Sequence, residues 1–177
     1  GHMEAVGYDL YCKMLSEAVK EAKGQVVMDD FETTIDLDID AFIPDSYIGN
    51  EFQKLDIYKR IAGIENEEEY EDMLEELLDR FGDPPKPVMN LMGIANLKAL
   101  AHKAYITEIK QLGKTVKITL YEKAKINPQG IPRVLAAHRR GLSFRAEDPP
   151  CFFYEGQAKD LNGILCLIDE IYRFTLP

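Results

Sequence analysis

The chain has 177 residues, of which 46% are apolar and 29% are charged, and its formal net charge is −10 at pH 7. This length predicts one domain with a core large enough to fold without disulfides or a structural metal, and no apolar run approaches the roughly 20 residues of a membrane span. The negative net charge argues against tight binding of nucleic acid by the whole chain. Residues 1–3 are expected to be a remnant of cloning, and residues 4–177 to form a single domain.

The first segments carry one helix signal and one strand signal. Residues 6–23 place apolar side chains at helical spacing and are followed by Gly24, a common helix terminator, so residues 4–24 are expected to form a linker helix. Apolar residues then alternate with aspartates over residues 35–40. This period of two is typical of a half-buried strand with one acidic face.

Three helices are predicted next. Ser46 or Asn50 could cap a helix that ends at Gly63, and Asn66 could cap a second helix that continues to residue 81. The buried stripe of the second helix is expected to consist of Tyr70, Met73, Leu74, Leu77, Leu78 and Phe81. The third helix is predicted over residues 87–103, with the buried positions Val88, Leu91, Ile94, Ala95, Leu97 and Ala101.

The remaining chain is richer in strand signals. Strands are predicted over residues 105–109, 116–121, 142–145 and 151–154, the first two joined as a hairpin through Leu112, Gly113 and Lys114. A short helix is predicted from Asn127 to Arg140, and a final helix over residues 157–174. The predicted fold is α+β: a helix-rich N-terminal half, a small and mainly antiparallel sheet of four or five strands, and a C-terminal helix.

No motif for catalysis or for metal binding survives scrutiny. The chain lacks a Gly-rich phosphate loop, His-Glu-x-x-His and Gly-x-Ser-x-Gly, and neither His102 nor His138 has a second ligand at metal spacing. Aspartates 36, 38 and 40 imitate the start of an EF-hand loop, but Ala41 and Tyr47 stand where that loop needs Gly and Glu. We therefore expect no catalytic residue, metal or cofactor.

The three cysteines are widely spaced, which favours a reducing cytosol over a disulfide framework. Cys12 and Cys166 lie in apolar helical stripes and are predicted to be core residues, whereas Cys151 is predicted to lie in a strand.

The helix over residues 66–81 has an unusual charge. Nine acids and no Lys or Arg occur between residues 65 and 79. The helical period places four of these acids along one exposed face: Asp72, Glu75, Glu76 and Asp79. This face is either a solvated surface or a docking strip for arginines, because carboxylates accept planar bidentate guanidinium bonds.

A basic stretch follows. Residues 98–145 hold 11 Lys or Arg against two acids, and the candidate second charged surface consists of Lys114, Lys117, Arg139 and Arg140. These cations could contact phosphate, which makes a nucleic-acid-binding accessory domain the alternative function. They could also complement a helix end or face the acidic residues within one fold.

Several segments in order resemble one family, the C-terminal domain of the bacterial transcription-repair coupling factors. The similar segments are Val6–Tyr11, Ile43–Ile48, Leu55–Ala62, Glu76–Gly82 and Asn90–Lys98. The resemblance is dense between residues 29 and 98 and weak after about residue 107.

The resemblance implies a non-catalytic regulatory domain of an ATP-driven DNA translocase in the bacterial cytoplasm. In this family the domain docks on a UvrB-like N-terminal module of the same protein, masks the surface that binds UvrA and restrains the motor until RNA polymerase is engaged. Carried over by position, the docking residues include Glu76 and Asp79. Arg80 is placed to pair with Glu76 at i,i+4. The hypothesis requires acids that another module can reach, rather than acids paired with arginines of the domain itself.

Overall fold

The computed structural model describes residues 31–138, 140–157 and 159–177. The predictions for the helix over residues 4–24, for Cys12 and for Arg139 lie outside these residues. The described residues form two compact units: unit 1 comprises residues 39–99, and unit 2 comprises residues 31–38 and 100–177.

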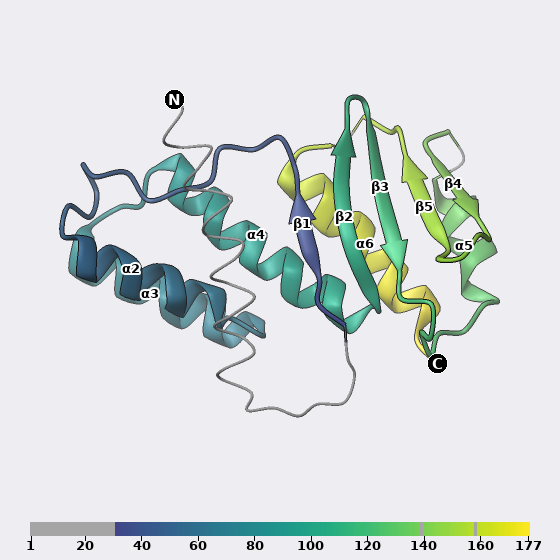
Figure 1. Cartoon of the computed structure of the whole chain (residues 1–177), viewed down its shortest axis with the longest axis horizontal. Coiled ribbons are helices and arrows are strands. Elements are labelled where there is room, and N and C mark those ends of the chain that lie inside the picture. Colours follow the sequence, from purple (N-terminus) through teal and green to yellow (C-terminus); the bar gives the residue numbers. More distant parts are fainter. Residues whose placement is uncertain (1–30, 139, 158) are drawn as a thin grey trace. The chain divides into compact units, whose positions relative to one another are not determined.

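Unit 1 is helical. It contains α2 (Glu51–Ala62), α3 (Glu67–Phe81) and most of α4 (Lys86–Lys103), which is assigned to unit 1 as far as Ala99 (Figure 1). The predicted caps are confirmed, since the side chain of Asn50 accepts a hydrogen bond from the backbone of Gln53 and Asn66 does the same for Glu69.

All six predicted buried positions of α4 are buried; five of them belong to the core of unit 1, and Ala101 belongs to unit 2. In α3 the buried stripe is narrower than predicted, because only Met73 and Leu77 are buried. The prediction for Leu78 is wrong: its side chain is 43% exposed. Leu78 lies 100° around the helix from Leu77, at the edge of the stripe, where a helix packed on one side meets solvent.

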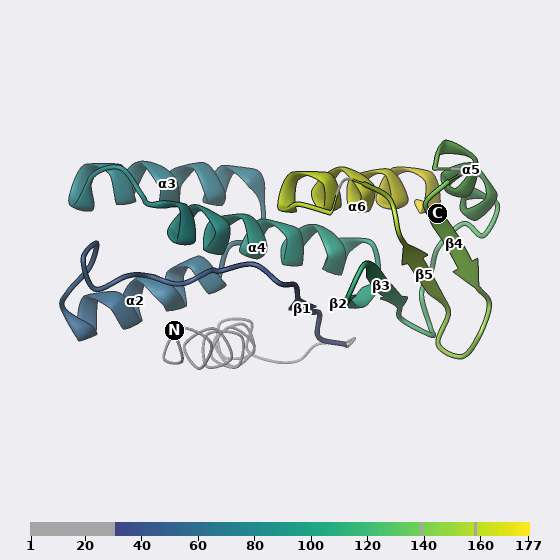
Figure 2. The same cartoon turned by 90° about the horizontal axis from the view of Figure 1, so that it is seen from above.

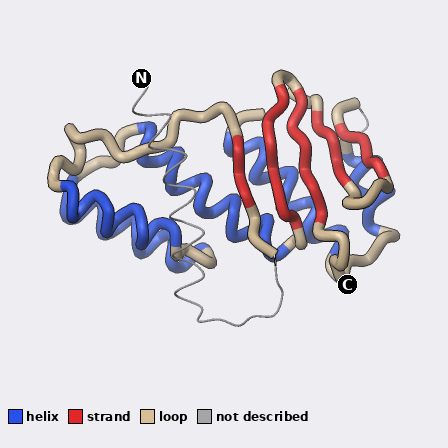
Figure 3. The backbone as a smooth tube through the Cα atoms, viewed as in Figure 1, coloured by secondary structure: helices blue, strands red, loops and turns tan. Residues whose placement is uncertain are grey.

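Unit 2 is built on a five-stranded sheet with the order β1-β2-β3-β5-β4 (Figure 3). The strands are β1 (Thr34–Asp36), β2 (Ile106–Leu112), β3 (Thr115–Leu120), β4 (Leu142–Arg145) and β5 (Cys151–Tyr154). β1 pairs parallel with β2, and all other neighbours are antiparallel. The predicted hairpin is confirmed, and Gly113 adopts φ +63° in its turn.

Two helices complete unit 2: α5 (Gly130–Ala137) and α6 (Leu161–Thr175). Both lie on the same face of the sheet (Figures 1 and 2). That face supplies apolar side chains that are fully buried, such as Ile109, Ile118 and Phe152, and α6 supplies Ile164, Ile168 and Ile171. The predicted fold class, α+β with a mainly antiparallel sheet and a C-terminal helix, is confirmed.

Three local predictions are wrong. The strand predicted over residues 35–40 ends at Asp36. Beyond it, the backbone N–H of Asp38 donates a hydrogen bond to the side chain of Gln111, and not to the backbone of a neighbouring strand. The helix predicted to reach Arg140 ends at Ala137, because the backbone of His138 leaves the helical region. Cys166 is exposed on α6 rather than in the core, whereas Cys151 is a buried strand residue as predicted.

No helix in the described ranges is both long enough and apolar enough to cross a membrane.

Candidate functional site

The acidic face of α3 is present as the sequence predicts. Asp72, Glu75 and Asp79 are exposed, while Leu77, on the opposite side of the helix, is fully buried. Within the described part of the chain these three carboxylates make no ion pair. They are therefore open to a cationic partner.

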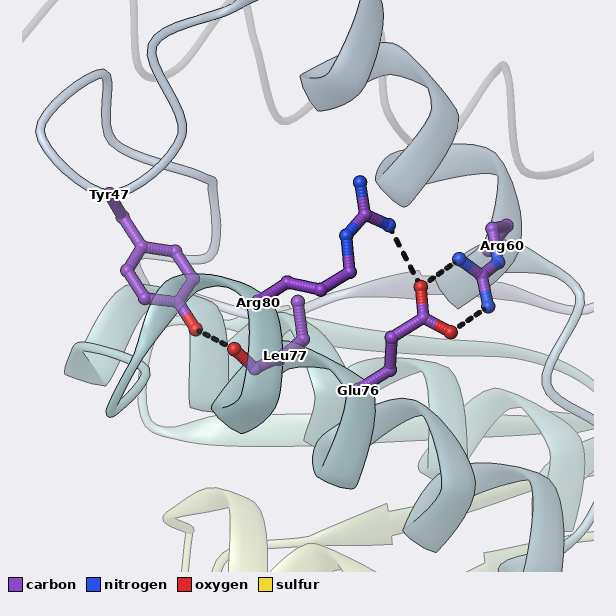
Figure 4. Close-up of polar contacts among 5 residues, drawn as sticks. All are labelled: Tyr47, Arg60, Glu76, Leu77 and Arg80. Atoms are coloured by element: carbon purple, nitrogen blue, oxygen red, sulfur yellow. Dashed lines mark hydrogen bonds and ion pairs between the residues drawn. The ribbon is translucent and has the colours of Figure 1, made fainter.

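Glu76 differs from its neighbours because two arginines hold it (Figure 4). Arg60 of α2 donates to both carboxylate oxygens in a bidentate pair, and Nη1 of Arg80 donates to Oε2 at 2.9 Å. The side chain of Glu76 remains 30% exposed. The predicted i,i+4 pair between Glu76 and Arg80 is confirmed.

These contacts change the pKa of Glu76 and the local charge. Hydrogen bonds from Arg60, and then from Arg80, lower the pKa of the Glu76 carboxyl to about 2, against a smaller opposing effect of burial. The three side chains carry a net charge of +1, since one carboxylate faces two guanidinium groups. The acidic face of α3 thus adjoins a small, locally cationic group formed by Glu76 and Arg80 of α3 and Arg60 of α2.

The end of α3 is fixed by a second set of contacts. The hydroxyl of Tyr47 lies 2.8 Å from the carbonyl oxygen of Gly82. It also lies 3.3 Å from the carbonyl oxygen of Leu77 (Figure 4). The ring of Tyr47 also packs against Phe81, over which Cζ of Arg80 lies 4.9 Å from the centroid. Burial, with the nearby Asp83 carboxylate, raises the pKa of Tyr47. The segment around Tyr47 therefore holds the turn of α3 that carries Asp79 and Arg80.

Sequence reasoning did not identify Arg60 as a partner of Glu76. The two residues are 16 positions apart on different helices, so no local spacing rule connects them. It also overlooked Phe52 and Leu55, whose side chains on successive turns of α2 are 84% and 41% exposed. Lys54, beside them, pairs with Asp45 and with Glu51.

The basic residues that the sequence singles out lie on different elements of unit 2. Lys114 lies in the turn between β2 and β3, Lys117 lies on β3, and Arg140 follows α5 and is exposed. None of the three makes an ion pair with another described residue.

Among residues 31–138, 140–157 and 159–177, no group of three or more His, Cys, Asp or Glu side chains could hold a metal ion. The aspartates at 36, 38 and 40 are exposed; of the residues between them, Leu37 is buried and Ile39 is half-buried.

Comparison with known proteins points to one family. The family model for the TRCF domain matches residues 37–131. Transcription-repair-coupling factors of Bacillus subtilis and Staphylococcus aureus are 40% identical over 131 and 132 residues, which is 73% of this chain and 11% of each relative. The chain thus matches about one tenth of the length of these relatives.

A solved structure agrees with these sequence matches. A crystal structure of the C-terminal domain of a transcription-repair coupling factor superimposes with a TM-score of 0.72 and is 26% identical in sequence, covering 81% of this chain and 94% of that one. The family match covers more than half of the chain and lies in both units. The chain therefore belongs to the TRCF domain family, the C-terminal domain of transcription-repair coupling factors.

Proposed function

We propose that this chain is a non-catalytic regulatory domain of a DNA-translocating transcription-repair coupling factor in the bacterial cytoplasm. It docks on the UvrB-like N-terminal module of the same protein, masks the surface that binds UvrA and restrains the motor. Engagement of RNA polymerase releases it. The family membership and the names of the relatives support this proposal.

The observation that carries the docking site is the row of exposed, unpaired carboxylates on α3. Asp72 and Asp79 stand two turns apart on a helix whose far side is buried, with Glu75 between them. Carboxylates in this arrangement can accept guanidinium groups from a partner without first breaking a bond within the domain. Asp79 has the further advantage of a fixed position, because Tyr47 holds the end of α3.

The role of Glu76 changes within this proposal. Its two oxygens already accept bonds from Arg60 and Arg80, so a partner arginine would have to compete with them. Glu76 therefore holds Arg80 and the end of α3 in place, and contributes less direct docking energy than Asp72 or Asp79.

An apolar contact would add strength to such a charged site. Phe52 and Leu55 offer an exposed apolar pair on α2 of the same unit. Aromatic side chains dominate binding energy at many protein interfaces, whereas exposed ion pairs contribute little each. Docking through the acids alone would be weak and sensitive to salt. Such a contact can be released, and it can still form because the two partners lie in one chain at high effective concentration.

The test is a titration of the purified chain with the purified UvrB-like module, at low and at high salt. We expect weak binding that Asp72→Asn/Asp79→Asn reduces at least tenfold. The matched control, Glu67→Gln/Glu71→Gln, removes the same charge from other exposed positions of α3 and should change the affinity less than twofold.

The outcomes separate the function from the site. Absence of binding by the unaltered chain would contradict the docking function. Binding that both double variants leave unchanged would keep the function and contradict the site. A loss of equal size in both variants would show that total charge, and not this face, drives docking.

A further inference from the structure

The sheet of unit 2 has a second face that no described helix of unit 2 covers (Figures 1 and 2). Side chains alternate across a strand, so the register identifies the residues on this face. On β3, Val116 and Ile118 point to the buried face and Lys117 points away from it. Lys117 is opposite Phe153 of β5 and Lys110 of β2 in the ladder.

Phe153 is the centre of a cationic group on this face. Cζ of Arg145 on β4 lies 4.7 Å from the centroid of the Phe153 ring, and Nζ of Lys117 lies 6.0 Å from it. Phe153 and Lys117 are half-buried, and Arg145 is exposed. These three side chains come from three adjacent strands, so their spacing is fixed by the ladder.

A second aromatic group lies where β3 ends. The Phe31 ring stacks between the rings of His102 and Tyr121, with centroid distances of 4.4 Å and 4.6 Å. Tyr121 follows Lys117 by four residues, or about 13 Å at the rise of a strand. Exposed lysines adjoin this group in the chain at positions 103, 123 and 125.

The cations of this face are not neutralised within unit 2. In the described residues, Lys110, Lys117 and Arg145 make no ion pair. Lys103 and Lys125 do not count toward this face, because they line a hollow with Tyr172 and Thr175 of α6. The register places Asp36 and Glu108 on the same face, in its β1–β2 half. A third acid, Glu155, follows β5 and accepts a hydrogen bond from Thr115 of β3 at 3.1 Å. Over β3, β5 and β4 the face therefore presents Lys117 and Arg145 around the Phe153 ring, with Glu155 beyond the end of β5.

We propose that this face binds single-stranded nucleic acid, with Lys117 and Arg145 on phosphates and the rings of Phe153 and Tyr121 against bases. Unpaired cations beside aromatic rings are the combination that recognises unpaired strands without sequence preference. A duplex hides its bases in the stack and offers these rings nothing to contact. The proposal concerns unit 2 and is independent of the docking function proposed for unit 1.

The experiment uses the whole chain and a fluorescently labelled ten-nucleotide oligothymidine, with binding followed by anisotropy. We expect saturable binding at 50 mM salt. With about three phosphate contacts, the affinity should fall roughly fortyfold at 300 mM salt. A duplex of ten base pairs and an oligoglutamate of equal charge should bind at least tenfold more weakly.

Two variants test the assigned residues. Lys117→Ala/Arg145→Ala should weaken binding at least tenfold, and Phe153→Leu should weaken it about tenfold with little change in salt dependence. The control Lys59→Ala/Lys86→Ala removes the same charge from exposed positions of unit 1 and should change the affinity less than twofold. Circular dichroism checks that each variant is folded.

The proposal is overturned if the unaltered chain shows no saturable binding at 50 mM salt. It is also overturned if the control variant loses as much affinity as Lys117→Ala/Arg145→Ala, because binding would then follow the total charge. Equal binding of the duplex or of oligoglutamate would show that bases make no contact with the face.

Discussion

The two units of this chain differ in net charge and in how their charged side chains are paired. Residues 39–99 of unit 1 carry 14 acids against six Lys or Arg, whereas residues 31–38 and 100–177 of unit 2 carry 11 against 12. In unit 1 two of the six cations, Arg60 and Arg80, form ion pairs with a single acid, Glu76. In unit 2 the lysines of the sheet face stay unpaired among described residues. One chain can therefore offer separate surfaces to partners of opposite charge.

The units also differ in what holds them together. Unit 2 depends on ladder pairing and on a close approach between α5 and α6, whereas unit 1 depends on a helical core with polar bonds at the ends of its helices. Substitutions that affect only one unit therefore test whether the two units are stabilised by different interactions. Amide hydrogen exchange can report on each unit separately.

The largest effect is expected for Gly130→Ala in unit 2. A Cβ atom at Gly130, the first residue of α5, would lie 1.8 Å from the backbone oxygen of Phe174 in α6. Because backbone must move to admit the methyl group, we expect a loss of about 3 kcal/mol in unfolding free energy. Urea denaturation measures it, and Gly49→Ala, where the nearest atom is 3.4 Å away, is the control. If unit 1 also lost exchange protection, the two units would not unfold separately.

The next effect is expected for Gly82→Ala in unit 1. Gly82 follows α3 with φ +86° and ψ −167°, a backbone region that is essentially restricted to glycine. We expect a loss of about 2 kcal/mol although space for the methyl group is open. Thermal unfolding followed by circular dichroism would measure it. A neutral result would show that the end of α3 can adopt another conformation at no cost.

Tyr47→Phe should have a smaller effect on the same unit. It removes the hydroxyl bonds to the carbonyl oxygens of Gly82 and Leu77 and keeps the ring contact with Phe81. We expect a loss of about 1 kcal/mol, because Gly82 is exposed and its carbonyl can bond water instead. The variant should also weaken docking through Asp79 if Tyr47 holds the end of α3. Unchanged stability and unchanged docking together would exclude that role.

The smallest effect is expected for Glu76→Gln, and it should depend on pH. Because the folded pKa of Glu76 is about 2, below its ordinary value of 4.5, ionised Glu76 stabilises the fold above about pH 4.5. The stabilisation is lost as the pH falls toward 2. With the side chain 30% exposed to screening solvent, we expect a difference from the unaltered chain of at most about 1 kcal/mol at pH 7.

Urea denaturation at pH 7 and at pH 2.5 would measure this difference, which should shrink at the lower pH. The control is Glu75→Gln, the neighbouring exposed acid, for which no ion pair exists among the described residues. A difference that does not change with pH would mean that the bonds from Arg60 and Arg80 contribute nothing to stability.

Much of this molecule could be predicted from local pattern. The caps at Asn50 and Asn66, the hairpin before Thr115 and the strands 142–145 and 151–154 were all predictable, because caps, turns and short apolar runs involve neighbours in the chain. The acidic face of α3 belongs to the same class, since helical geometry alone places Asp72 and Asp79 on one side.

Other features were not predictable, because they depend on residues that are distant in sequence. The strand around Ile35 is short because its ladder with β2 ends at Lys110, and α5 stops early because the backbone turns at His138 toward β4. Cys166 belongs to an apolar helix yet faces solvent, since only packing decides which side of α6 meets the sheet.

Local sequence pattern predicts most of the helices and strands, the uneven distribution of charge and the family. Only the tertiary structure decided which charges remain available. It brought Arg60 to Glu76 across two helices, left Asp72 and Asp79 open, and set Lys117, Phe153 and Arg145 side by side on three strands. The physical reason is that an ion pair or a ring contact requires an approach of a few ångströms, which chain order does not encode and folding alone creates.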